Sequence, residues 1–326
     1  MKQRNRILGP LFVVLAFCMS HSANASEVSF EIHGMIQVWV QSVKDEINGV
    51  ENMGILSKRS EVALVSTNEG PVSWVLMFDL AGGGGKEMQD AFITYQFSDA
   101  VTGKAGQFHV PSSLEGIQGA GGLWFPERAF ISRQGLGDYR DRGFVAMGDM
   151  GDLSYTVGLF NGEGGNANPS EDIRRFAGRV NYKVSDAITL GAWTDSNDDT
   201  DDVSSANMAE FSASGVDIQW HDDAWSVQAE IASKSEPADE SGAYIMAKYA
   251  VSENLMVAAR IDSYTIDAVT GVNEIEKTAF DFGITFFPAD AKGLKTQLAI
   301  RMGSTEQAGT ADQDIEELIA NIQFNW

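Results

Sequence analysis

Residues 318–326 read LIANIQFNW, and this stretch at the end of the chain decides the fold class. Apolar side chains fill every second position, and Ile319 is the one exception to the alternation: the apolar positions are Leu318, Ala320, Ile322, Phe324 and Trp326. Period two turns one face of a β-strand toward an apolar medium and the other toward a polar one. A terminal aromatic residue suits a membrane–water interface, so the stretch favours the closing strand of a membrane barrel over a strand of a soluble sandwich.

The opposite end has the features of a removable export signal over residues 1–25. The basic residues Lys2, Arg4 and Arg6 precede a short apolar run at 11–19, and residues 23–25 offer a small-x-small cleavage site. The apolar run is too short to cross a bilayer as a helix. Removal takes Cys18, the only cysteine, so we expect residues 26–326 to form one exported domain without a disulfide or a thiolate site.

The charge and hydropathy of the chain narrow its class. The formal net charge is −23, and removal of the signal, which carries three basic and no acidic residues, makes it −26. A chain this acidic does not bind nucleic acid through a basic surface. No later segment reaches about 18 consecutive apolar residues. Two classes remain, a soluble periplasmic protein and a barrel whose apolar residues are spread over alternate positions.

Segments of about 9–13 residues with alternating polarity recur along the chain, and this is the length of tilted barrel strands. Short turns and longer polar loops alternate between them, which a soluble sandwich has no reason to do. The pattern predicts an all-β, antiparallel transmembrane barrel with sixteen strands, although the stretch 127–133 is a rival strand. The predicted strands are 28–40, 57–67, 70–80, 88–98, 101–110, 142–150, 152–161, 173–184, 186–196, 209–221, 223–234, 242–251, 253–265, 276–287, 292–303 and 315–326.

Several stretches in the first half resemble the phosphate-selective porin O and P family. They are DAFITYQF at 90–97, GQFHVP at 106–111, PER at 126–128, RG at 142–143 and LSYTVGLFNG at 153–162. The resemblance implies a sixteen-stranded, trimeric channel in the bacterial outer membrane, with a long third loop folded into the lumen. Members often carry Pro-Phe-Gly after the Val-Pro step, whereas Pro111 is followed here by two serines. The chain is also shorter and more acidic, so phosphate selectivity is not carried over with the fold.

The third long loop, 110–141, is the longest and contains candidate constriction residues. Arg128, Arg133 and Arg140 are its basic residues, and Glu115, Glu127 and Asp138 are acidic. The lumen of a sixteen-stranded barrel is wide enough for an aqueous channel. Charged side chains on an inward loop would set the field that a passing ion feels. The alternative is a solvated outer loop.

Alternation also places basic side chains on the polar, lumen-facing side of the wall. They include Arg175, Arg179 and Lys183 on one span and Arg59, Arg260 and Arg301 on others, beside acidic residues such as Glu61. A unit charge about 4 Å from an ion is worth about 1 kcal/mol in water and more where water is confined. Uncompensated arginines therefore predict a basic ladder with weak anion preference and no tight phosphate site. The alternative is that these charges pair with inward acids and solvate the wall.

The sequence offers no motif for catalysis, a metal or a cofactor. The acidic loop from Asp195 is similar to a calcium loop, but Thr200 and Ala206 replace the glycine and glutamate that such a loop needs. A solvated outer loop, or loose binding of divalent cations near lipopolysaccharide, remains. GGGGK at 82–86 lacks the spacing and the Ser/Thr of a phosphate loop. Histidines are scarce and widely separated, so we expect neither an enzyme nor a cofactor.

These observations predict a passive outer-membrane channel for small hydrophilic solutes and ions, surrounded by lipid and lipopolysaccharide. The alternative is a structural or adhesive barrel with an occluded lumen; an outer-membrane hydrolase would need a Ser–His pair. We expect a homotrimer, mainly from the resemblance. Gly34 and Ala320, on the outward faces of the first and last strands, would permit close approach of a neighbouring subunit.

Overall fold

The computed structural model describes residues 29–45, 50–67, 69–81, 87–169, 173–198, 210–235, 238–268, 273–309 and 312–326. The predicted signal at 1–25 and the glycine-rich stretch 82–86 lie outside these ranges. Residues 199–206 of the acidic loop lie outside them as well.

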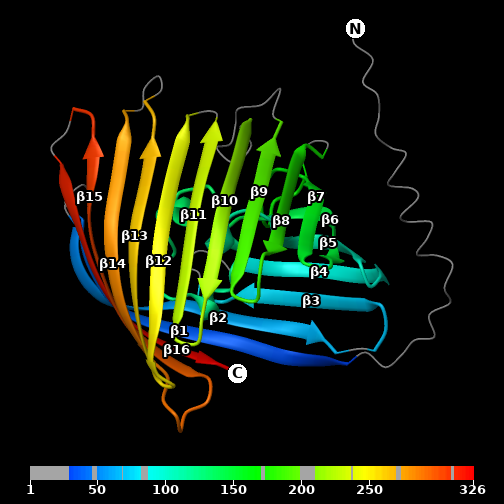
Figure 1. Ribbon diagram of the computed structural model, residues 1–326, viewed down its shortest axis with the longest axis horizontal. Coiled ribbons are helices and arrows are strands. Elements are labelled where there is room, and N and C mark those ends of the chain that lie inside the picture. The colour runs from blue at the N-terminus through cyan, green and yellow to red at the C-terminus, as the bar shows by residue number, and fades with distance from the viewer. Residues whose placement is uncertain are drawn as a thin grey trace.

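Sixteen strands within the described residues form one closed antiparallel barrel, in which each strand pairs with its neighbours in the chain and β1 closes against β16 (Figure 1). The first eight are β1 (Phe30–Asp45), β2 (Val50–Ser66), β3 (Val72–Asp79), β4 (Glu87–Ser98), β5 (Val101–His109), β6 (Arg140–Met150), β7 (Leu153–Phe160) and β8 (Arg175–Lys183). The others are β9 (Ile188–Asn197), β10 (Phe211–His221), β11 (Trp225–Ser235), β12 (Glu240–Ser252), β13 (Leu255–Ile266), β14 (Ile275–Phe286), β15 (Leu294–Gln307) and β16 (Gln313–Asn325). The predicted fold class and strand count are confirmed.

One local prediction was wrong, and one alternative is excluded. The expected loop at 41–56 is mostly strand, because β1 continues to Asp45 and β2 begins at Val50, so the first hairpin is taller than the alternation indicated. The rival strand at 127–133 instead contains a short helix, α3 (Phe130–Arg133). Its apolar residues Phe130 and Ile131 are consecutive and both are buried, which a half-buried strand does not allow.

β16, the closing strand, pairs with β1, as the alternation at residues 318–326 predicts. Val38 lies opposite Ile322 and Val40 opposite Ala320, while Gly34 and Trp326 exchange two backbone hydrogen bonds of 3.1 Å each. A Cβ atom on Gly34 would lie 2.1 Å from the Trp326 ring. The space above Gly34 is therefore filled by this chain's own terminal indole, so the expectation that Gly34 leaves room for a neighbouring subunit was wrong.

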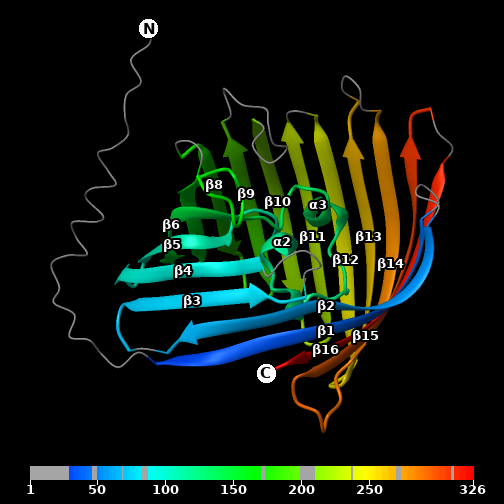
Figure 2. The ribbon, with the colours of Figure 1, turned by 180° about the vertical axis from the view of Figure 1, so that it is seen from behind.

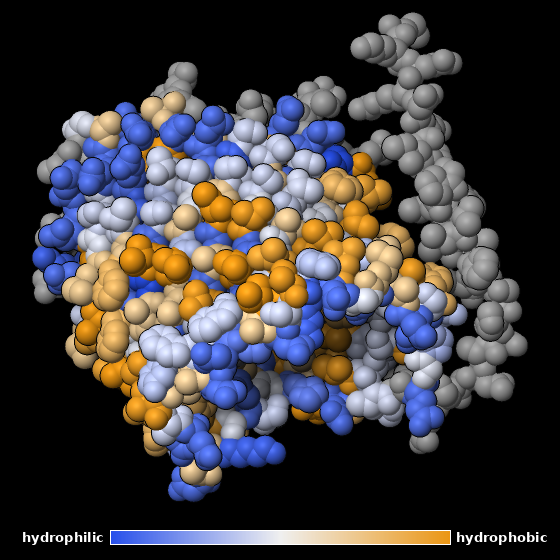
Figure 3. Space-filling view, in the orientation of Figure 1, coloured by the Kyte–Doolittle hydropathy of each residue, from blue (hydrophilic) through white to orange (hydrophobic). Residues whose placement is uncertain are grey.

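The side chains on the outer and inner faces of the barrel wall differ in polarity, as β14 illustrates. On β14 the outward side chains Phe280, Phe282 and Ile284 are exposed, while Asp281 and Gly283 between them are buried. Figure 3 shows apolar residues gathered over the middle of the outer face and hydrophilic residues along its upper rim. Such an apolar band between polar rims is the outer surface that a lipid bilayer requires.

Strand tilt gives the barrel its shape. In Figures 1 and 2, β9–β14 stand side by side on one side of the barrel, and β1–β4 cross at a steep angle on the other. Front and back walls cross in this way because strands must tilt to close a barrel. Among the described residues, no helix is long and apolar enough to span a membrane.

The longest connection lies between β5 and β6, and we call residues 110–139 the inner segment. It contains the short helices α2 (Leu114–Ile117), η1 (Ala120–Gly122) and α3. Figure 2 shows α2 and α3 within the outline of the barrel, in front of β10–β12. A cluster of buried apolar residues joins the segment to the wall; it includes Phe125, Phe130, Ile131, Trp193, Tyr244 and Tyr264. The packing makes the inner segment a fixed part of the barrel interior.

Candidate functional site

The inner segment is bound to wall residues that face the interior of the barrel. Lys295 on β15 donates to the carbonyl oxygen of Gly121 at 2.9 Å, and Gln297 donates to that of Trp124 at 3.0 Å. On β13 the Tyr264 hydroxyl donates to the Gln134 carbonyl oxygen at 3.2 Å. These contacts distribute the attachment over most of the length of the segment and fix its course across β8–β16.

Two carboxylates of the wall hold the beginnings of the short helices. Glu230 on β11 accepts hydrogen bonds from Ser113 Oγ at 3.0 Å and from the Leu114 backbone N–H at 3.1 Å, where α2 begins. Asp262 on β13 accepts from the backbone N–H of Phe130 at 2.8 Å, where α3 begins. The first N–H groups of a helix have no partner within it, so an acceptor placed there satisfies them and fixes the position of the turn.

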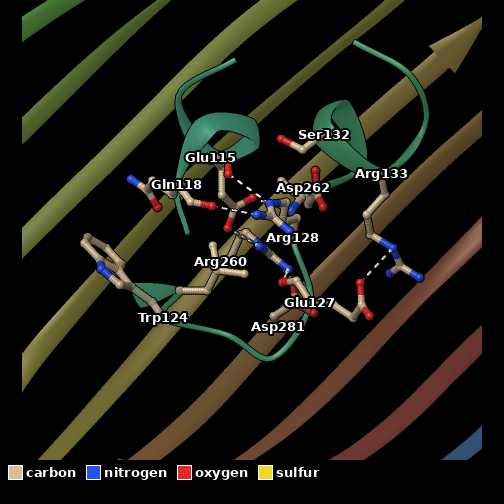
Figure 4. Close-up of polar contacts among 12 residues, drawn as sticks. Glu115, Gln118, Trp124, Glu127, Arg128, Ser132, Arg133, Arg260, Asp262 and Asp281 are labelled. Atoms are coloured by element: carbon tan, nitrogen blue, oxygen red, sulfur yellow. Dashed lines mark hydrogen bonds and ion pairs between the residues drawn. The ribbon is translucent and has the colours of Figure 1, made fainter. Parts of the chain in front are cut away.

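A network of buried charges lies beneath these helices (Figure 4). Arg260 binds Asp281 at 2.7 Å and Glu115 of the inner segment at 3.2 Å. Arg301 binds Asp281 at 2.7 Å and Asp262 at 3.1 Å. At most 5% of each of these side chains is exposed. Two guanidinium groups and three carboxylates thus neutralise most of one another's charge, and none is available to a passing solute.

The predicted ladder on β8 is paired in the same way. Arg175 donates two hydrogen bonds to Asp195, at 2.8 and 2.5 Å, and lies 3.6 Å from Asp141. Arg179 binds Asp217 at 2.7 Å and the Ser112 carbonyl oxygen at 2.9 Å. The prediction that these arginines are uncompensated was wrong, because neighbouring strands place an aspartate beside each. Lys183 lies at the other end of β8, half exposed and bound to Asp186 at 2.7 Å, away from the inner segment.

The arginines of the third loop have separate roles. Arg128 is buried and joins parts of the inner segment, donating to the carbonyl oxygens of Glu115 at 3.0 Å and Gln118 at 2.6 Å. Arg133 is more exposed and lies 3.4 Å from Glu127. Arg140, the first residue of β6, binds Asp90 on β4 at 2.9 Å. The structure therefore brings Arg133 and Arg140, but not Arg175 or Arg179, to the more exposed part of the interior.

Charged side chains in the interior fall into two groups by exposure. On the side of β8–β15 the arginines Arg175, Arg179, Arg260 and Arg301 are at most 6% exposed, while the Lys234–Glu240 pair is 16% and 11% exposed. A second group on the side of β2–β6 is 15–33% exposed, and we call it the hydrated cluster. Its members are Lys58, Arg59, Glu61, Asp90, Glu127, Arg133, Asp138 and Arg140. The cluster as defined contains four basic and four acidic residues, so its formal charge is balanced.

The inner segment reaches the β2 side through one close ion pair. Lys58 Nζ lies 2.7 Å from Glu127 Oε1 and 4.5 Å from the centre of the Trp39 ring. Lys58 is the extra residue where the pairing of β1 and β2 shifts register, since Gln37 lies opposite Arg59 and Val38 opposite Ser57. A bulge brings consecutive side chains to one face, and strict alternation could not have identified Lys58 as an inward residue.

Two carboxyl groups of the inner segment differ in their titration. Burial raises the pKa of Asp138, and the attraction of Arg128 offsets this only in part. Burial also acts to raise the pKa of Glu127, but Arg133 and Lys58 outweigh it and lower the pKa below its usual range. Asp138 is therefore neutralised at a higher pH than an ordinary aspartate, whereas Glu127 keeps its charge to a lower pH than an ordinary glutamate. Within the described residues, no group of His, Cys, Asp and Glu side chains could hold a metal ion.

Sequence reasoning missed the carboxylate anchors as a group. Glu230 and Asp262 are inward by parity, which the sequence shows, but their binding to backbone N–H groups of a distant loop leaves no local pattern. Arg59 and Glu61 lie where parity places them, 4.0 Å apart at their closest charged atoms. Arg260 and Arg301 are also inward, but they are buried under the inner segment and do not line open space.

Comparison with known proteins agrees with this architecture. The family described as phosphate-selective porin O and P matches residues 30–270. The outer-membrane channel DcaP of Acinetobacter baumannii is 11% identical, with a TM-score of 0.69 over 93% of this chain and 99% of that one. OmpT of Vibrio cholerae in its trimer form is 11% identical, with a TM-score of 0.68 over 92% and 100%. A porin of Rhodopseudomonas blastica is 16% identical, with a TM-score of 0.59 over 91% and 100%.

No curated protein matches the chain significantly in sequence. The structural relatives share its fold, and the family match covers most of its length. The chain belongs to the phosphate-selective porin O and P family and is a sixteen-stranded, non-enzymatic channel-type barrel of the bacterial outer membrane.

Proposed function

We propose that this porin is a passive diffusion channel whose aqueous path runs along the hydrated cluster, between the inner segment and β2–β6. The observation that carries the proposal is the difference in exposure between the two sides of the interior. Arg175, Arg179, Arg260 and Arg301 on the β8–β15 side are at most 6% exposed, whereas the side chains of the hydrated cluster are 15–33% exposed. Water reaches one side of the interior, and a solute follows the water.

The balance of charge supports weak ion selectivity and no tight phosphate site. Anion affinity requires guanidinium groups that are not already neutralised, and Arg175 and Arg179 are bound to buried aspartates. In the hydrated cluster each basic residue has an acidic one close by, as Arg140 has Asp90. Small hydrophilic solutes of either sign, and neutral ones, are the substrates that such a mixed surface admits.

The path can be tested by cysteine modification in planar bilayers, because the chain has no cysteine once the signal is removed. We expect stepwise conductance from the purified protein, and Glu61→Cys should lose conductance when a bulky charged thiol reagent is added. Ala213→Cys on the opposite wall, 4% exposed, is the matched control and should not react. A bilayer that stays sealed at all voltages would favour an occluded barrel instead, and block of Ala213→Cys alone would place the path on the other side.

We also propose that the channel assembles as a homotrimer. The trimer form named for the Vibrio cholerae relative supports this state. The outward faces of β1 and β16, where Val38, Ile322 and Ala320 lie close together, offer an apolar surface. Native mass measurement in mild detergent tests the assembly, and a monomer throughout would reject it.

A further inference from the structure

The outer face of the barrel carries a hollow of about 370 Å³ between β4 and β7. Its apolar lining includes Met88, Ala91, Phe144, Leu159 and Ile173. Leu159 and Ile173 are about half exposed and belong to the outward face, so the hollow opens toward the membrane rather than the lumen. It lies at the end of the wall where the longer loops emerge, because Met88 is the second residue of β4 and Ile173 precedes β8.

Two glycines contribute to the lining of the hollow. Gly106 and Gly143 lie opposite each other on β5 and β6 and line the hollow with backbone alone. Gly106 has a φ of +135°, which side chains rarely adopt. A Cβ on Gly143 would lie 2.3 Å from Phe160 and 2.5 Å from the Leu159 carbonyl oxygen. Phe160 and the backbone of β7 therefore require a glycine at position 143, and the positive φ together with the backbone of β4 requires one at position 106.

The lining is polar only toward the loop end. Gln107, Arg142 and Asn161 lie there. The Arg142 side chain donates to Asn168 at 3.2 Å, which uses one of the five donors of its guanidinium. The adjacent carboxylate, Asp141, is fully buried and faces Arg175 and the Gly162 N–H, so it does not bind the Arg142 side chain in place of a ligand.

We propose that this hollow binds an acyl chain of a phosphorylated lipid of the outer leaflet, with Arg142 contacting the phosphate group. Each buried methylene favours binding, and a basic residue at the membrane surface attracts an anionic headgroup. Phe144 and Leu159 lie further from the loop end than Arg142, so an acyl chain packed on them would place its phosphate group beside the guanidinium. A neighbouring barrel fits the hollow less well. Its convex wall would contact the rim, but its side chains would not reach Gly106 and Gly143 at the bottom of the hollow.

Lipid binding can be measured by native mass spectrometry of the whole protein in detergent, titrated with diphosphoryl lipid A. Ala91→Trp fills the hollow and should weaken binding about tenfold or more. Its control is Ile93→Trp, which is outward on the same strand and 59% exposed but does not line the hollow. Arg142→Gln should weaken binding about fivefold. Its control is Lys183→Gln, which removes one positive charge at the opposite rim.

The outcomes separate the possible occupants. Selective loss in Ala91→Trp and Arg142→Gln, with both controls unchanged, supports the lipid site. Equal lipid binding by all variants overturns it. Loss of the oligomer in Ala91→Trp with lipid binding intact would assign the hollow to a subunit contact, and displacement of the lipid by inorganic phosphate would assign it to a free anion; either overturns the proposal. Single-channel conductance should be unchanged in these variants, so this test is independent of the proposed channel function.

Discussion

Replacing Arg179 with alanine distinguishes a paired structural arginine from a free charge in the pore. The Arg179 guanidinium donates to Asp217 at 2.7 Å, to the Ser112 carbonyl oxygen at 2.9 Å and to Asn181 at 3.0 Å. The side chains of Arg179 and Asp217 are 3% and 0% exposed. The substitution leaves the Asp217 carboxylate buried without its cation and releases the start of the inner segment.

The expected loss is large because the remaining charge stays buried. Removing one partner of a buried ion pair lowers the free energy of unfolding by about 3–5 kcal/mol, whereas replacing both partners by apolar groups of similar size is close to neutral. We therefore expect Arg179→Ala to be strongly destabilised. Arg179→Met combined with Asp217→Leu should recover most of the loss, while the reversal potential in a salt gradient remains near that of the wild type.

The matched comparison is Arg59→Ala in the hydrated cluster. Arg59 is 15% exposed, donates to Gln37 at 2.7 Å and lies 4.0 Å from its closest acidic atom, so its loss should lower the free energy of unfolding by about 1–2 kcal/mol, less than that of Arg179. Because it lies beside the aqueous path, the same substitution should shift the reversal potential toward cations. The assays are urea unfolding in lipid vesicles, followed by tryptophan fluorescence, and reversal potentials in planar bilayers. A shift toward cations in Arg179→Ala with an unchanged unfolding midpoint would refute the reasoning.

Three further predictions concern the inner segment. Lys58→Gln removes the 2.7 Å ion pair with Glu127, and it should increase current fluctuations in single-channel records while changing stability by less than about 1 kcal/mol; quiet records would show that the pair is no tether. Glu230→Ala removes the acceptor at the start of α2, and it should lower the free energy of unfolding by about 2–3 kcal/mol in urea titrations, unlike Glu253→Ala in an exposed turn. Because burial raises the pKa of Asp138, acidification should remove its negative charge at a higher pH than for an ordinary aspartate and move the reversal potential toward anions; this contribution should be absent in Asp138→Asn.

The fold could be predicted from the sequence because every strand of a membrane barrel follows the same alternation of apolar and polar side chains. Lipid on one side and water on the other impose alternation on every strand, and residues 318–326 display it almost without exception. The alternation fails where the strands depart from this regular geometry, at the first hairpin and at a bulge. At the first hairpin the strands extend beyond the apolar band, so the residues of β2 before Lys58 read as a polar loop although they pair with β1. At Lys58 a bulge interrupts the parity.

The pairing of charges could not be predicted from the sequence. Alternation predicts which face of the wall a residue lies on, but not which neighbouring side chain it contacts. Arg175 and Asp195 lie on adjacent strands, and the register that brings them together depends on the turn between them. Glu115 meets Arg260 only because the inner segment crosses the interior. The choice between a basic ladder and paired charges was thus left open by the sequence, and it depends on contacts between residues 20 and 145 positions apart.

The inner segment is bound more strongly to one side of the barrel than to the other, and this difference supports the proposed path. Toward β8–β15 the inner segment is held by buried carboxylates and guanidinium groups, whose hydrogen bonds are directional and tolerate little displacement. Toward β2 it is held by Lys58 and Glu127, which are 33% and 15% exposed, so this pair gains less energy and is partly screened by salt. A segment fixed on one side and weakly tied on the other yields on the weak side first. Displacement of the segment should therefore widen the space along the hydrated cluster and leave the buried network intact, so that a change in conductance does not require unfolding of the interior.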